Sequence, residues 1–214
     1  MRRAVLRAAT IAATMAFVSP LFAPQLLAFP YHATSRGSEV WSEAPLPQPQ
    51  LDRVTGRAAQ LVAASPLARA SEPRHIFLTQ GGWRWAWLAL QNRRSFALSR
   101  AMGEPVIVNR GDVATDRLRG VTRSLSGVLA HETCHGMERR HFGAIRSDIL
   151  APRWLREGYC DYVAQESTLS AADASRLKAE GRTAPALVYY EGRRRVAAEL
   201  ARNGGNVEAL FAAN

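Results

Sequence analysis

Two histidines and the acid beside the first of them carry the clearest chemical signal in the sequence, which reads His131-Glu132-Thr133-Cys134-His135. On a helix, residues four apart lie on one face a turn apart, so both imidazoles can point at the same ion. Two imidazoles supply half of a tetrahedral zinc site. Glu132 projects about 100° round the helix from His131, where its carboxylate can take a proton from a water on the metal. The motif therefore predicts a Zn²⁺ centre with Glu132 as its general base.

A catalytic zinc site needs a third protein ligand, and the sequence offers two candidates. His141 follows His131 by ten residues, as in the pattern H-E-x-x-H-x-x-G-x-x-H. That pattern requires a glycine where this chain has Glu138, so His141 is expected at the surface or at a helix end, and Glu138 on a solvated charged face. Glu157 is the stronger candidate. Two helices joined by a loop over residues 143–151 can pack antiparallel and direct it at the same ion as the two histidines.

The segment around Glu157 adds a family resemblance. H-E-x-x-H followed some twenty residues later by W-L-x-E-G-x-x-x-Y resembles the gluzincin branch of zinc metallopeptidases, most of all the small peptidase-MA-like families related to aminopeptidases. The resemblance implies that Glu157 completes the metal site with the two motif histidines. It also implies that Asp161 accepts a hydrogen bond from His131 and orients that ring. A tyrosine on a later helix, Tyr190 or else Tyr189, would hydrogen-bond the oxyanion.

The resemblance covers residues 120–212 and implies a zinc-dependent hydrolase of peptide bonds, acting on a peptide or a protein. It does not extend to the G-x-M-E-N-like segment with which aminopeptidases bind a free N-terminus, so exopeptidase activity is not implied. The alternative is a non-enzymatic, membrane-tethered zinc-binding or scaffold protein that keeps the fold. Cys134 and Cys160 stand at matching offsets from the ligands, where they form either a disulfide or two buried thiols.

The first thirty residues are typical of a membrane-targeting segment. Three arginines precede an uncharged run over residues 8–29, which as a helix would reach about 33 Å and cross a bilayer core. Positive charge before such a run predicts that the chain after it is exported. We favour an uncleaved anchor over a cleaved signal, although Pro20 and Pro24 would kink a spanning helix. In either case the catalytic domain, residues 31–214, is expected outside the cytoplasm, anchored at the membrane or secreted.

Composition excludes several other classes of protein. The 214 residues are 47% hydrophobic and 21% charged, which excludes disorder and coiled coil. Two cysteines exclude a disulfide scaffold. The formal net charge of +10 would suit nucleic acid, but Lys178 is the only lysine, and such a bias indicates coding preference more than a phosphate-binding surface. Nucleic acid is therefore not expected as a partner.

The pattern of elements predicts an α+β fold, with a small N-terminal sheet-bearing lobe followed by a helical zincin-like lobe that contains the metal-binding helix. Short β-branched runs indicate strands at residues 75–79, 96–99 and 105–109, and the alternation of Trp83, Trp85 and Trp87 is also typical of a strand. Helical periodicity predicts helices over residues 51–65, 121–142, 152–166, 171–180, 184–203 and 206–213.

Overall fold

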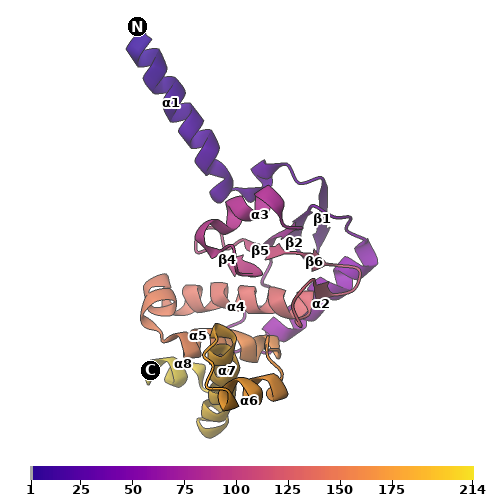
Figure 1. The fold of residues 1–214 in the computed structure, drawn as a ribbon, viewed down its shortest axis with the longest axis vertical. Helices are drawn as coiled ribbons and strands as arrows, with labels where there is room; N and C mark the ends of the chain where they lie inside the picture. Colours follow the sequence, from indigo (N-terminus) through magenta and orange to yellow (C-terminus); the bar gives the residue numbers. More distant parts are fainter. Residues whose placement is uncertain (1) are drawn as a thin grey trace.

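The computed structural model describes residues 2–214 and combines helices with a five-stranded mixed sheet (Figure 1), which confirms the α+β class at a coarse level. The strands run in the order β1-β2-β3-β5-β4. The three central strands are parallel, and the two edge strands are antiparallel to their neighbours. Their bounds are β1 Tyr31–Ser35, β2 Ser38–Ser42, β3 His75–Thr79, β4 Ala97–Ser99 and β5 Val106–Asn109, with a small second sheet of β6 Gly111–Asp112 and β7 Arg117–Leu118.

The hairpin of β1 and β2 is one element that the sequence patterns do not predict. Arg36 and Gly37 join the strands with φ of 50° and 79°, the positive values of a two-residue type I′ turn. Strand β1 is mostly exposed, whereas β2 alternates between buried and half-buried positions. The residues of β1 are those of a sheet edge, and neither β1 nor β2 has the apolar run by which β3 and β5 are recognised.

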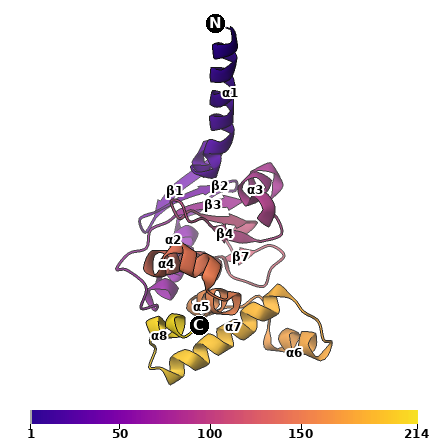
Figure 2. The ribbon, with the colours of Figure 1, turned by 90° about the vertical axis from the view of Figure 1, so that its left-hand side faces the viewer.

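Helices cover both faces of the sheet, because alternate residues of a strand point to opposite sides. Phe77 and Ile107 pack against α3, whereas Leu78 and Val108 belong to the core shared with α2 and α4. Figure 2 shows α2 and α4 together on the side of the sheet away from α1. These helices span α2 Gln48–Ala63, α3 Gly82–Ala89 and α4 Leu125–Phe142, and a 3₁₀ turn, η3 Leu90–Asn92, follows α3.

Helix α4 lies between the sheet and a second layer of helices. Leu125 and Val128 pack toward the sheet, whereas Cys134 and Met137 pack toward the later helices. The helix begins after Ser124, whose hydroxyl accepts a hydrogen bond from the Gly127 amide, so it starts four residues later than its periodicity predicts. The later elements are the π-helical turn η4 Ile145–Leu150 and the helices α5 Arg153–Ala164, α6 Ala171–Ala179, α7 Pro185–Arg202 and α8 Val207–Ala212.

Helices α5 and α7 cross with their backbones in contact. A Cβ added to Gly192 would lie 2.2 Å from the carbonyl oxygen of Trp154, and one added to Gly158 would lie 2.4 Å from the carbonyl carbon of Gly192. Neither position can carry a side chain without moving the helices apart. The crossing fixes the rotation of α7 about its own axis, so it decides which of its side chains face α5.

The three alternating tryptophans lie on a helix, and the strand predicted from them is wrong. Trp85, Leu88 and Ala89 are buried in α3, at the spacing of one helical face. Trp83 is 60% exposed. The buried stripe at positions i, i+3 and i+4 outweighs the alternation of the aromatic residues, because only the helix brings all three apolar side chains to the sheet.

The uncharged N-terminal run does not form one helix. Helix α1, Arg2–Val18, projects from the rest of the fold (Figure 1), and two 3₁₀ turns follow it, η1 Ser19–Leu21 and η2 Pro24–Leu27. Each turn carries a proline in its first two positions, where proline cannot continue the preceding helix. Within residues 2–214, no helix has the length and the apolar character needed to cross a membrane.

The segment after α1 packs onto the domain. Leu27 is buried in the apolar cluster that α3 forms with the sheet. The guanidinium of Arg84 donates to the carbonyls of Leu27 and Ala28, at 2.9 and 3.1 Å. That of Arg100 donates to the Leu21 carbonyl. These contacts make the segment a part of the folded unit.

We expect this segment to remain on the mature protein. Cleavage after Ala28 would remove Leu27 from the core and take carbonyl acceptors from Arg84 and Arg100, both of which cost stability. The intact mass of protein purified from an exporting host should include residues 19–30. A chain that starts at residue 31 should be less stable than one that starts at residue 19 by about 2 kcal/mol or more. A mature N-terminus beyond residue 19, or equal stability of the two chains, would contradict this.

Candidate metal centre

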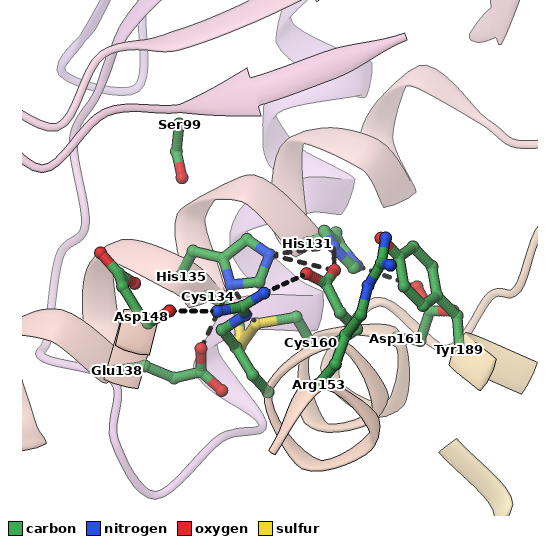
Figure 3. A network of polar contacts seen from close by, with 12 residues as sticks. Ser99, His131, Cys134, His135, Glu138, Asp148, Arg153, Cys160, Asp161 and Tyr189 are labelled. Carbon is green, nitrogen blue, oxygen red and sulfur yellow. Dashed lines mark hydrogen bonds and ion pairs between the residues drawn. A yellow bond between two sulfur atoms is a disulfide. The ribbon is translucent and has the colours of Figure 1, made fainter. Parts of the chain in front are cut away.

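Helices α4 and α5 bring three of the predicted ligands together, as Figure 3 shows. The Nε2 atoms of His131 and His135 lie 3.2 Å apart, and they lie 3.4 and 3.5 Å from Oε2 of Glu157. A tetrahedral ion with bonds of 2.0–2.1 Å requires ligand atoms about 3.3–3.4 Å apart. The three atoms therefore have the spacing of one face of a zinc tetrahedron.

The outer nitrogen of each ring lies beside a buried carboxyl group. Nδ1 of His131 is 2.8 Å from Oδ1 of Asp161, at an angle short of a good hydrogen bond, and Nδ1 of His135 is 3.2 Å from Oε2 of Glu138. Such neighbours favour the proton on Nδ1, which leaves a lone pair on each Nε2. Two lone pairs and a carboxylate oxygen that face one another repel unless a cation lies between them. The donor set therefore fits a divalent metal ion.

The directions of the pKa shifts of these groups indicate that the side chains around the two histidines favour positive charge. Burial by itself would lower the pKa of His135, but the charge of Glu157 and the contact with Glu138 raise that pKa well above its ordinary value. The pKa of His131 is also raised, because Asp161 and Glu157 outweigh burial. Burial would raise the pKa of Glu157, yet the two imidazoles hold it well below its usual range. A cluster of side chains with this potential suits a cation.

A buried arginine, which no sequence pattern indicates, holds Asp161 in place. Asp161 is fully buried and accepts hydrogen bonds from Arg123 and Ser167, each at 2.8 Å. Burial would raise the pKa of Asp161, but His131 and Arg123 keep it below its usual value. Since the Arg123 side chain is only 1% exposed, the pair is shielded from water, and Asp161 can hold the His131 ring in one orientation.

Glu138 is buried, so the solvated charged face expected for it is wrong. Its side chain is 0% exposed, because α4 is covered by the sheet on one side and by helices on the other. Burial raises the pKa of Glu138, and the nearby His135 offsets only part of that shift. His131, His135 and Glu138 occupy positions i, i+4 and i+7, which form one stripe of a helix. That spacing is the signal in the sequence that points to Glu138 as a partner of the second histidine.

Removal of the Glu138 carboxyl group should weaken metal binding. In Glu138→Ala the His135 ring loses the group beside its Nδ1, and loss of such a partner typically lowers metal affinity about 10- to 100-fold. Glu138→Gln should recover part of the affinity, because the amide oxygen can still accept from Nδ1. Titration against a zinc chelator measures both. Glu208→Ala, which removes a carboxylate beside the exposed His141, is the matched control, and equal affinity of the two alanine variants would contradict the role.

Glu132, the expected general base, is buried in α4 and does not belong to the group of converging ligand atoms. Its carboxylate is thus not consumed as a ligand. His141 lies outside the site. It pairs with Glu208 and its side chain is 37% exposed, which confirms the prediction of a surface residue.

Figure 3 shows Tyr189 together with Arg153 near the two histidines. Tyr189 is three positions before Gly192 and so faces α5, whereas Tyr190 is two positions before it, about 200° round the helix. The Tyr189 hydroxyl accepts a hydrogen bond of 2.8 Å from Arg153. Burial and the negative charge of Glu157 raise the pKa of Tyr189, so it remains a phenol able to donate a hydrogen bond.

A disulfide joins the two helices that carry the ligands. Cys134 and Cys160 are bonded, with their Cα atoms 5.4 Å apart, which is the first of the two alternatives that the sequence leaves open. Cys134 precedes His135 directly, and Cys160 follows Glu157 by three residues. The disulfide therefore fixes α4 against α5 at the level of the metal ligands.

Around a zinc ion, two imidazoles and one carboxylate would occupy three corners of a tetrahedron and leave the fourth open, as in catalytic zinc sites, whereas structural sites are closed. Glu132 follows His131 directly in α4, and Figure 3 shows the Tyr189 phenol near the two histidines, so the arrangement can polarise a carbonyl group, move a proton and stabilise an oxyanion. No protein-family model, curated protein or solved structure with which the chain was compared matches it.

Proposed function

We propose that the protein is a zinc-dependent hydrolase of peptide bonds. The observation that carries the proposal is the triangle of His131 Nε2, His135 Nε2 and Glu157 Oε2, with sides of 3.2–3.5 Å. Glu132 follows His131 in α4 and is not one of the three converging residues. Zinc held by these three residues would supply a Lewis acid that polarises the scissile carbonyl and lowers the pKa of water to about 7.

The residues of the chain have separate tasks in this reaction. Glu132 takes a proton from the attacking water and returns it to the nitrogen of the leaving amine. Tyr189 donates a hydrogen bond to the oxyanion and takes the role expected of Tyr190. Asp161 and Glu138 orient the two imidazoles through their Nδ1 atoms.

The proposal places the site outside the cytoplasm, on a protein attached to the membrane by its N-terminal segment. A disulfide such as Cys134–Cys160 persists in oxidising compartments and is rare in the cytosol. The three arginines before the uncharged run agree with export of the rest of the chain. In this proposal the helices from α4 onward make up a zincin-like lobe, and α4 packs this lobe against the sheet.

Metal analysis of the purified full-length chain, combined with peptide hydrolysis, tests the proposal. We expect about one zinc per chain, and a chelator should abolish cleavage of casein or of a peptide library until zinc is restored. His135→Ala should lose both the metal and the activity, because only two ligands remain. His141→Ala, which removes an exposed histidine outside the site, should keep both.

A chain without bound metal, or His135→Ala with unchanged metal content, would overturn the metal centre. Stoichiometric zinc without hydrolysis of any peptide would instead favour the non-enzymatic zinc-binding protein. The two measurements together therefore separate the failure of the site from the failure of the activity.

A further inference from the structure

Arg153 places an exposed positive charge beside the candidate metal centre. It is the first residue of α5 and lies one helical turn before Glu157. Its guanidinium donates to the Tyr189 hydroxyl at 2.8 Å and lies 5.1 Å from the centroid of the Tyr189 ring. Figure 3 shows Arg153 and Tyr189 together on the side of the two histidines opposite Asp148.

The other arginines around the centre are neutralised by carboxylates. Arg123 pairs with Asp161 at 2.8 Å, and Arg156 lies 3.3 Å from Oε1 of Glu157. The other oxygen of Glu157 faces the imidazoles. Both oxygens of this carboxylate therefore already have partners other than Arg153. Over the described chain, residues 2–214, no carboxylate lies within ion-pair distance of Arg153, whose recorded partner is a neutral phenol.

We propose that Arg153, held by Tyr189, binds a carboxylate of the peptide substrate. The inference rests on the proposed hydrolase function and adds a substrate class to it. A guanidinium matches a carboxylate with two parallel hydrogen bonds. The contact with Tyr189 fixes the side chain before the substrate arrives, so less conformational entropy is lost on binding. The position beside the ligands places the bound carboxylate near the scissile bond.

Two parts of a peptide present this chemistry, namely a free C-terminus and the side chain of Asp or Glu. A binding experiment distinguishes them with one fluorescent peptide in three forms. The first has an amidated C-terminus and an internal Gln, the second a free C-terminus and the same Gln, and the third an amidated C-terminus and Glu in place of Gln. The zinc-loaded full-length Glu132→Gln chain, which should not consume the peptide, is the parent protein.

We expect one of the two carboxylate-bearing forms to bind about 10- to 100-fold more tightly than the neutral form. In the Arg153→Gln background this advantage should fall to within about threefold. Arg153→Lys should keep part of it, since the charge remains but the planar fork is lost. Arg194→Gln removes an exposed arginine of α7 that takes no part in the site, and it should keep the whole advantage.

The form that gains affinity identifies the source of the carboxylate. Equal affinity of all three forms for the parent protein would overturn the inference, and so would an advantage that survives in Arg153→Gln. Hydrolysis by the chain with Glu132 intact is followed separately. If the advantage depends on Arg153 but no form is cleaved, the hydrolase function fails while the carboxylate site stands.

Discussion

Replacement of Glu132 by glutamine should abolish peptide hydrolysis while zinc stays bound. The carboxamide has nearly the shape of the carboxylate, so the buried position in α4 remains filled. It cannot accept and return a proton, and general acid–base catalysis typically contributes a factor of about 100 to 10,000. The proposed metal ligands are three other side chains, so metal content should not change. We expect kcat to fall by that factor.

The measurement pairs the turnover of one peptide with zinc analysis of the same sample. Glu180→Gln serves as the control, because Glu180 is an exposed residue paired with Arg182 and lies outside the site. A Glu132→Gln protein that still cleaves peptides within a few-fold of the unmodified rate would refute the assigned role. Loss of zinc in that variant would show that Glu132 contributes to metal binding and not to proton transfer.

The geometry of one helix allowed much of the centre to be anticipated from sequence. The four-residue spacing of His131 and His135 is enough to place two rings on one face of α4, because helical geometry is local. The same argument puts Asp161 one turn beyond Glu157. That the two helices meet follows only from the packing of their apolar faces, which spacing alone does not determine.

The burial of Glu138 and the partner of Arg123 depend on tertiary packing, which the sequence patterns do not show. Glu138 is followed by two arginines and has the pattern of a solvated face, yet the sheet and the later helices close over it. Arg123 meets Asp161 across 38 residues of chain, and no periodicity connects them. The choice between Tyr189 and Tyr190 depends on the glycine crossing of α5 and α7, so a shift of one residue would reverse it.

The N-terminal half was harder to predict because its elements are short and because side chains of one strand pack against helices on both faces of the sheet. Strands β3 and β5 were recognisable as apolar runs, and most of their residues are buried. The hairpin of β1 and β2 lacks such a run, and α3 presents its tryptophans in an alternation that imitates a strand. The segment after α1 is uncharged like a membrane span, yet its two prolines turn it and Leu27 enters the core of the domain.

Loss of the disulfide should destabilise the protein by several kcal/mol. The bond between Cys134 and Cys160 closes a loop with a sequence separation of 26. A loop of this length corresponds to about 3.5 kcal/mol of unfolded-state entropy. Urea unfolding with a chelator present, so that zinc does not contribute, should show this decrease when a reductant is added. The chain has only these two cysteines, and both are in this bond. No other disulfide can therefore form within the chain when it is reduced and reoxidised.

The double variant Cys134→Ala, Cys160→Ala separates the bond from other effects of the reductant. It should unfold at about the urea concentration of the reduced protein, and its midpoint should not respond to reductant at all. An unmodified protein whose midpoint is the same with and without reductant would contradict the prediction. Since the bond ties α4 to α5 beside His135 and Glu157, the same variant should also bind zinc more weakly, because the two helices must then be held together by packing alone.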